Sequence, residues 1–133
     1  MSAFSSYLEN KTLDHILGGG DYSRPATVYL ALFTAAPTES GGGTEVSGGS
    51  YARLAITNNS TNFPAASGGS KSNGTTITLG PASAGWGTVS HWAIFDASTG
   101  GNMLYFGACG SAKAIDTSDS FTIAASQLTI TLD

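Results

Sequence analysis

The sequence predicts an all-β protein, either an antiparallel β-sandwich or a jelly-roll-like barrel of about seven to eight strands, with one N-terminal helix. Short apolar segments alternate with turn signals along most of the chain, some at the spacing that is typical of sandwiches and barrels. Glycine accounts for 18 of the 133 residues, as expected for a protein with many turns. Because only one segment has a helical pattern, the chain lacks the crossover helices that a parallel sheet needs.

The predicted helix lies in the N-terminal segment. Residues 6–9 (Ser-Tyr-Leu-Glu) match a capping box, and the three glycines at 18–20 end the helix. Its apolar residues fall on two opposite sides. One side is Phe4, Tyr7 and Leu8, and the other is Leu13, Ile16 and Leu17. Either one side covers the sheet while the other contacts a partner, or the helix bends near Asn10 and both sides face one core.

The first strands follow this helix. Residues 27–34 are an apolar segment between two prolines, which predicts a buried central strand. Residues 39–50 are rich in glycine and nearly free of apolar side chains, which predicts a surface loop. Residues 51–57 alternate as in a half-exposed strand, so Arg53 is expected to face solvent or a partner. The residues expected to point inward from this strand are Ala52, Leu54 and Ile56.

A hairpin at residues 89–108 is predicted to occupy the centre of the sheet. Its first arm, residues 89–95, has large or apolar side chains on both sides, so neither face is expected to meet water. A loop with two glycines, residues 97–101, joins this arm to the second one, residues 102–108. These features favour a simple antiparallel connection.

Three shorter strands complete the predicted sheets. Residues 74–79 alternate before the hairpin, and residues 120–125 and 127–132 form two closing strands after it. In the last strand the residues expected to point inward are Leu128, Ile130 and Leu132. We expect residues 1–20 to form a helical segment and residues 21–133 to form a single β-sandwich domain.

The charge of the chain is low and evenly spread. Only 11% of the residues are charged and the formal net charge is −4, so no basic surface for nucleic acid is expected. A surface of small neutral polar residues is easily dehydrated, which suits repeated contact with neighbouring subunits. No apolar segment is long enough to span a membrane, and the N-terminus lacks the pattern of a signal peptide. We therefore expect neither membrane insertion nor export through a signal sequence.

The cysteine and histidine residues are few and separated. The single cysteine, Cys109, excludes an internal disulfide and a standard zinc site, and we expect it to be a buried apolar side chain. His15 is expected to pack or to cap carbonyl groups at the helix end, and His91 to be neutral and hydrogen-bonded in the core. Neither histidine is placed to activate a nucleophile.

Three aspartates lie at predicted strand ends. They are Asp96, Asp116 and Asp119. Turn capping is their expected role, and a weak hard-cation site between residues 116 and 119 is the alternative. The sequence therefore predicts no catalytic residue, no cofactor and no metal, and hence no enzyme.

Trp86 lies between two glycines just before the hairpin. If buried, it closes the end of the sandwich, which is the interpretation we adopt. If exposed, it offers a stacking platform for a sugar or an anchor for an interface.

Four segments of the chain form a specific pattern. They are residues 28–37 (VYLALFTAAP), 42–53 (GGTEVSGGSYAR), 62–66 (NFPAA) and 86–96 (WGTVSHWAIFD). The pattern resembles a family of small virion proteins of tailed bacteriophages, and the resemblance covers nearly the whole chain. Members are often labelled tail fibre proteins, while other virion proteins of this size and composition are cement or decoration proteins of the capsid. The resemblance carries no catalytic residues.

The resemblance implies a structural virion protein that is made in the host bacterial cytoplasm. We expect a capsid cement or decoration protein that binds the outer surface of the assembled head and bridges its subunits, because the sequence has no repetitive fibre shaft. Its expected partners are the major capsid protein and copies of itself. The alternative is a tail fibre or tail-tip module that contacts other tail proteins and host-surface glycans. The expected contact residues are Phe4, Tyr7, Leu8, Glu45, Tyr51 and Arg53, with Trp86 as the candidate glycan-binding or interface aromatic.

Overall fold

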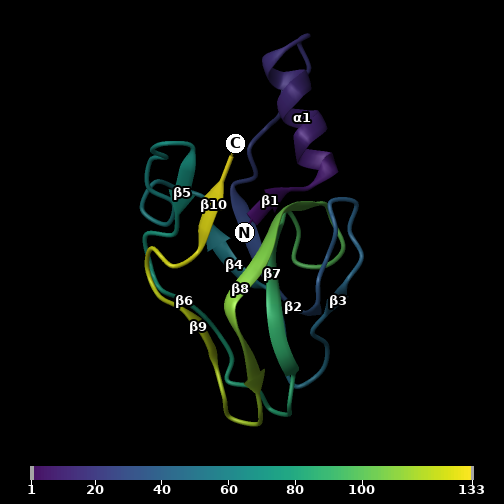
Figure 1. The fold of residues 1–133 in the computed structure, drawn as a ribbon, viewed down its shortest axis with the longest axis vertical. Helices are drawn as coiled ribbons and strands as arrows, with labels where there is room; N and C mark the ends of the chain where they lie inside the picture. Colours follow the sequence, from purple (N-terminus) through teal and green to yellow (C-terminus); the bar gives the residue numbers. More distant parts are fainter. Residues whose placement is uncertain (1, 133) are drawn as a thin grey trace.

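The computed structural model describes residues 2–132 and contains one large antiparallel sheet (Figure 1). Its strand order is β1-β8-β7-β2-β3, and β4 pairs with β2 beside β3. The strands of this main sheet are β1 (Ser2–Phe4), β2 (Thr27–Ala35), β3 (Thr44–Glu45), β4 (Leu54–Thr57), β7 (Gly87–Phe95) and β8 (Met103–Ile115). All of its pairings are antiparallel.

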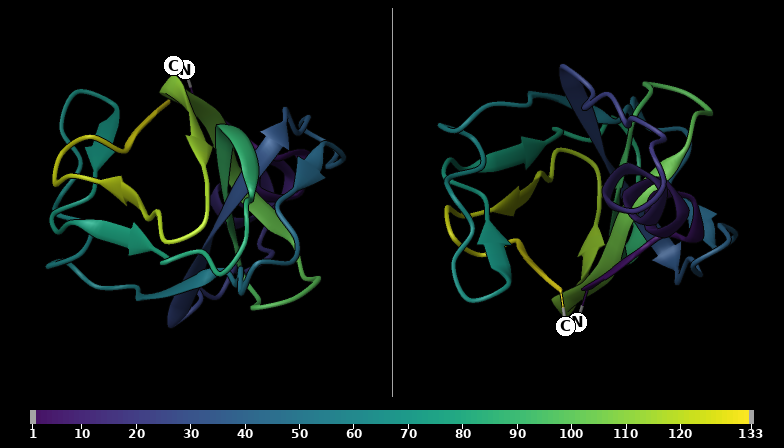
Figure 2. Two further views of the ribbon diagram at one scale, coloured as in Figure 1. Left: turned by 90° about the horizontal axis from the view of Figure 1, so that it is seen from below. Right: turned by 90° about the horizontal axis from the view of Figure 1, so that it is seen from above.

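Two small sheets face the main sheet across the middle of the molecule (Figure 2). One pairs β5 (Ser70–Ser72) with β10 (Thr129–Thr131), and the other pairs β6 (Ile77–Leu79) with β9 (Phe121–Ile123). Side chains from both layers form one core, because each layer has an apolar face that must be covered. The core includes Leu30, Leu32, Val89 and Ile115 from the main sheet and Ile77, Leu79, Phe121 and Leu128 from the other layer. The prediction of an all-β antiparallel fold with one helix is confirmed.

The predicted hairpin is the pair β7 and β8, and it lies at the centre of the main sheet. Strand β7 is paired on both edges, with β2 on one side and β8 on the other. Residues on both faces of β7 are buried, since Trp92 and Ile94 on the inner face retain 5% and 2% of their exposure and Ala93 on the outer face is fully buried. A second small apolar cluster, which includes Phe33 and Met103, covers the outer face of the sheet. The expectation of a central strand with no free face is confirmed.

Strand β8 is longer than the sequence predicts. The predicted arm ended at residue 108, but the strand continues to Ile115 and pairs with β7 as far as Gly87. Residues 108–114 are small or polar and mostly exposed, so they carry no apolar pattern. Pairing of the backbone, which the side chains do not reveal, extends the strand.

Two residues that were expected to point inward are exposed, because each lies just outside a strand. Ala52 is exposed because β4 begins only at Leu54, so the alternation does not apply before that residue. Leu132 retains 52% of its exposure because it lies beyond the end of β10. The predicted surface loop at residues 39–50 also contains the short strand β3 and the buried Val46.

Asn73 is a buried polar residue that the sequence did not single out. Its side-chain amide donates to the carbonyl oxygens of Thr75 and Ala124, and its amide oxygen accepts from the backbone N–H of Leu128. The bonds to Ala124 and Leu128 tie the loop after β5 to the closing segment of the chain. Buried polar side chains are tolerated when they are satisfied in this way.

The helix α1 (Ser6–Ile16) is preceded by a strand that the sequence did not predict. Strand β1 pairs with β8, so the N-terminal segment begins as an edge strand of the main sheet. The helix cap is Ser5 rather than Ser6, because the Ser5 side chain accepts the N–H of Leu8. With Ser5 as the cap, the capping box predicted at residues 6–9 is wrong, whereas the predicted end before the glycines is confirmed.

Candidate interface

The N-terminal end of α1 is fastened to the main sheet and to a neighbouring turn. The Ser5 N–H donates to the Leu104 carbonyl oxygen over 2.9 Å, and the Ser5 hydroxyl donates to the Met103 carbonyl oxygen. The Ser6 N–H donates to the Glu39 carbonyl oxygen over 2.9 Å. These bonds satisfy groups that a helix N-terminus otherwise leaves free, and they fix the direction in which α1 leaves the sheet.

One side of α1 and the strand before it pack onto the sheet. Leu8 retains 5% of its exposure, and the Phe4 ring meets the Tyr105 ring edge-on with centroids 4.9 Å apart. Tyr7 is half-buried against the same core. Leu8, one of the expected contact residues, therefore has almost no surface to offer to a partner as the chain stands.

The opposite side of α1 is uncovered. Leu13, Ile16 and Leu17 are 58%, 68% and 71% exposed, and we call these three residues the α1 ridge. They are three of the four large apolar side chains that are strongly exposed among residues 2–132. The helix is a single unbroken element, so the alternative of a bend at Asn10 that turns both sides to one core is wrong. Figure 1 shows α1 protruding beyond the sheets, so the ridge is open to a partner.

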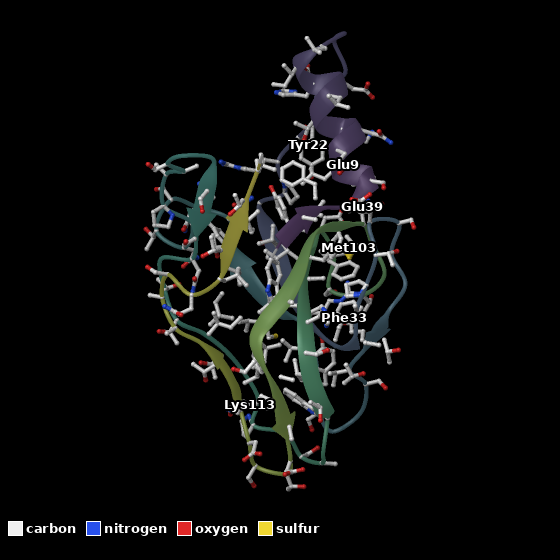
Figure 3. All side chains as sticks on the ribbon, in the orientation of Figure 1. Glu9, Tyr22, Phe33, Glu39, Met103 and Lys113 are labelled. Atoms are coloured by element: carbon white, nitrogen blue, oxygen red, sulfur yellow. The ribbon has the colours of Figure 1, made fainter. Side chains whose placement is uncertain are left out.

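A groove of about 410 Å³ lies at the foot of α1. Its walls come from the start of the helix, the turn at residues 38–42 and the loop between β7 and β8. Figure 3 shows Glu39 and Met103 near the lower end of the helix. The lining residues include Ser6, Tyr7, Glu39, Ser40, Phe95 and Asn102. The groove combines two aromatic rings with hydroxyl groups and one carboxylate.

Three of the expected contact residues are held together by contacts within the chain. We call Glu45, Tyr51, Arg53 and Phe95 the Arg53 cluster. Arg53 forms a bidentate ion pair with Glu45, with both N–O distances 2.9 Å, and its guanidinium carbon lies 3.7 Å from the centre of the Phe95 ring. The Arg53 side chain is only 8% exposed and that of Glu45 is 26% exposed. The expectation that Arg53 faces solvent is wrong, because it lies before the start of β4 and its charge finds partners inside the chain.

The Arg53 cluster also holds the loop between β7 and β8. Arg53 Nη1 donates to the carbonyl oxygens of Ala97 and Gly100, each over 2.9 Å. Within that loop, the Asp96 carboxylate accepts from the backbone N–H and the side-chain amide of Asn102. The loop that forms one wall of the groove is therefore fixed at several points.

Tyr51 completes the Arg53 cluster on its inner side. Its hydroxyl donates to Glu45 Oε2 over 2.7 Å and accepts from the Leu32 N–H over 3.0 Å. Burial of the ring raises the pKa of Tyr51, and the hydrogen bond to the Glu45 carboxylate adds to this shift. Its role in this chain is structural, since both capacities of the hydroxyl are used internally.

Trp86 is buried, as the interpretation of a plug expects. It retains 5% of its exposure, and its indole N–H donates to the Gly49 carbonyl oxygen over 2.9 Å. Gly49 has a φ of +59° and a Cβ there would lie 2.9 Å from Trp86 Nε1, so only glycine fits this approach. A sugar cannot stack on this ring as the chain stands, because its faces are covered.

The side chains that could bind a metal or take part in catalysis are dispersed. No group of three or more His, Cys, Asp or Glu residues that could hold a metal ion occurs among residues 2–132. Cys109 is half-buried, and burial raises the pKa of its thiol, which disfavours the reactive thiolate. Asp119 Oδ2 accepts the Asp116 N–H, which is the expected turn-capping role.

The two histidines make local hydrogen bonds. His91 Nδ1 lies 2.8 Å from the Ser90 hydroxyl oxygen, and the ring is half-buried in β7. His15 Nδ1 accepts the Tyr22 N–H over 3.2 Å, so it caps an amide rather than the carbonyl groups that the sequence suggested. Within residues 2–132 no carboxylate is hydrogen-bonded to His91, so the Ser90–His91 pair lacks the third group of a catalytic triad.

The model of a protein family described as podophage GP4 fiber I protein gp80 matches residues 3–131 of the chain. The chain belongs to this family. The gp80 family comprises small phage virion proteins, so the resemblance seen in the sequence is confirmed, and the chain is a fibre-related structural protein of a phage virion. No curated protein matches the chain. Within residues 2–132, no helix has the length and apolar character needed to cross a membrane.

Membership of the gp80 family agrees with the form of the candidate interface. The surface offers a protruding apolar helix side and a neighbouring groove. The sequence had separated the ridge residues Leu13, Ile16 and Leu17 from the other side of the helix, but named the other side for contact. It gave no signal for Glu39, which reaches the groove only through the fold.

Proposed function

We propose that this protein is a non-enzymatic adhesion subunit of the virion, most simply a capsid decoration or cement protein, attached through the α1 ridge. The observation that supports this proposal is the exposure of Leu13, Ile16 and Leu17 on a helix whose first residues are hydrogen-bonded to the main sheet and to the turn at Glu39. Burying three large apolar side chains against another protein contributes several kcal/mol, about 1.5–3 kcal/mol for each one fully buried. An interface core of this kind is typical of permanent assemblies.

The composition of the surface supports a position among many neighbours. With only 11% charged residues, copies on adjacent capsid sites repel one another little. The partners in this proposal are the major capsid protein and further copies of the chain. Because such a protein binds the assembled shell better than free subunits, it stabilises the shell by mass action.

A second position on the particle is supported by the printed description of the family, which names a fiber protein. In that position the chain is a tail fibre or tail-tip module that contacts other tail proteins and host-surface glycans. Trp86 is then not the ring that a sugar stacks on, since it is buried.

Electron microscopy of intact particles with gold-labelled antibody against the chain tests both positions. Gold over the head surface, together with earlier heat-induced release of DNA from particles that lack the chain, supports the decoration protein. Gold confined to the tail, with unchanged heat stability of the head, contradicts the decoration protein and supports the fibre module. Particles without any label contradict both positions.

A further inference from the structure

We propose that the exposed side of α1 and the groove at its foot form one continuous docking strip for a segment of another virion protein, with a Lys or Arg at one end and apolar side chains at the other. A protein partner on the particle is part of the proposed function, on which this inference rests. The strip adds to the proposed function by specifying which side chains the partner segment carries.

The strip is continuous because of the helical repeat. Ser6, which lines the groove, lies on the same side of the helix as Glu9 and Leu13, three and seven residues further on. An 11-residue helix is about 16 Å long. A short segment of a partner therefore reaches from the groove to the α1 ridge.

The groove end of the strip is acidic. Glu39 is the one carboxylate among its lining residues, and no Lys, Arg or His lines it. Within residues 2–132 no ion pair or hydrogen bond engages the Glu39 carboxylate. Tyr7 and Phe95 also line the groove, but each ring already faces a cation of the chain, Lys11 at 5.8 Å and Arg53 at 3.7 Å. The preference therefore comes from Glu39, because a carboxylate without a partner favours a Lys ammonium or an Arg guanidinium over a neutral or anionic group.

The charges on α1 add to this preference. Glu9 lies on the strip between the groove and the ridge, and it is exposed. Lys11 lies on the opposite side of the helix, with its Nζ 5.8 Å from the centre of the Tyr7 ring. The strip thus presents Glu39 and Glu9 at its groove end and the three apolar side chains of the α1 ridge at the other, with the exposed Asp14 beside the ridge.

The groove is formed before a partner arrives. Ser5 and Ser6 fasten the helix start to β8 and to the turn at Glu39, while Arg53 holds the loop that forms the opposite wall. A site whose walls are already fixed loses little conformational entropy on binding. This favours specific docking of one segment over loose adhesion.

A second copy of α1 does not fit the strip. In a parallel pair of helices, the acidic end of one copy faces the acidic end of the other, which costs free energy through repulsion. In an antiparallel pair, the ridge of each copy covers Glu9 and the groove of the other, so an apolar surface would bury an unpaired carboxylate. The occupant we propose is therefore a different protein with complementary charge.

The test uses the full-length chain, fluorescently labelled, and particles purified from a phage that lacks the gene for it. Binding is measured by co-sedimentation at about 0.05 M and about 0.5 M salt. We expect the double variant Leu13→Gln/Ile16→Gln to bind at least about tenfold more weakly at both salt concentrations, because it loses apolar burial. We expect Glu39→Gln to bind about threefold more weakly at low salt and equally at high salt.

Two control variants make the same kinds of substitution at positions outside the strip. Leu132→Gln alters an exposed leucine away from α1, and Asp116→Asn alters an exposed carboxylate in the turn between β8 and β9. We expect both to bind like the unaltered chain. Circular dichroism checks that all four variants are folded.

The outcomes separate this inference from the proposed function. If the unaltered chain binds the particles and the ridge and Glu39 variants bind equally well, the strip is wrong while the adhesion function stands. If the unaltered chain does not bind, the adhesion function fails. If the isolated chain sediments as a dimer that Leu13→Gln/Ile16→Gln converts to a monomer, the occupant is a second copy and the inference is overturned.

Discussion

The Arg53 cluster and the α1 ridge have the reverse of the solvent exposure that their residue types suggest. Arg53 is a charged residue that the sequence places outside, yet its side chain is only 8% exposed. Leu13, Ile16 and Leu17 are apolar, yet each retains more than half of its exposure. The difference lies in the partners that the fold provides, since Glu45, Phe95 and two carbonyl groups surround Arg53 while nothing in residues 2–132 covers the ridge.

This contrast separates stability from binding. Residues whose partners lie within the chain contribute to the free energy of unfolding, whereas residues whose partner is another molecule contribute to association. Substitutions in the Arg53 cluster are therefore expected to destabilise the isolated chain, whereas substitutions in the α1 ridge are expected to leave its stability unchanged. The following five tests run from the largest expected change to the smallest.

Arg53→Ala is expected to lower the free energy of unfolding by about 3 kcal/mol, because it leaves the half-buried Glu45 carboxylate without its ion pair and frees the loop after β7. Urea denaturation measures the change. Arg24→Ala, at an exposed arginine, is the matched control and is expected to change stability by less than about 0.5 kcal/mol. Equal losses in the free energy of unfolding for Arg53→Ala and Arg24→Ala would mean that the contacts of Arg53 within the chain do not stabilise it.

Ser5→Ala is expected to cost about 2 kcal/mol, since the helix loses its cap and the Met103 carbonyl oxygen loses its side-chain donor. The same denaturation experiment measures it. Ser6→Ala is the control, because Ser6 lies one residue inside the helix and does not cap it. A larger loss for Ser6→Ala than for Ser5→Ala would place the cap one residue later.

Tyr51→Phe is expected to cost about 1.5 kcal/mol at neutral pH, because Glu45 loses a donor and the buried Leu32 N–H loses its acceptor. Tyr29→Phe, at a half-exposed ring, is the control and is expected to cost less. Similar losses in both variants would show that the Tyr51 hydroxyl is not part of a cohesive cluster.

The pH dependence of stability gives Tyr51 a second readout. Burial raises its pKa in the folded chain above the value in the unfolded chain, so folding favours the neutral phenol. The resulting stability is fully present below about pH 10, the ordinary pKa of tyrosine, and falls as the pH rises above it. We expect Tyr51→Phe to reduce this alkaline loss, which urea denaturation across the alkaline range measures.

Leu13→Gln/Ile16→Gln is expected to change the free energy of unfolding by less than about 0.5 kcal/mol, because both side chains are already exposed and glutamine suits a helix. Thermal and urea denaturation of the isolated chain measure this. A loss of about 2 kcal/mol or more would mean that the ridge packs within the chain, and the ridge would then no longer be a free surface.

The centre of the fold could be predicted from the sequence because its strands are apolar on both sides. The predicted strands at residues 27–34 and 89–95 have this property, and they became β2 and the core of β7. Strand β1 and the second half of β8 could not be predicted, since they are held by backbone pairing and carry short or mixed side chains. Local patterns do not encode such pairing.

The candidate interface was only half predictable. The two apolar sides of the helix followed from the helical repeat, but the side that faces the sheet is set by Ser5 and its bonds to β8. The hydrogen bond from the Ser5 hydroxyl to the Met103 carbonyl oxygen joins residues 98 positions apart in the chain, so no local sequence pattern predicts it. Likewise, Arg53 meets the loop at Ala97 and Gly100 only through the fold.

A density map of the intact virion, at a resolution that shows side chains, measures the contact directly. We predict that the map places the α1 ridge against apolar side chains of a different virion protein and places a Lys or Arg of that protein beside Glu39. A map in which the chain is attached through another face, with Leu13, Ile16 and Leu17 open to solvent, would contradict this prediction.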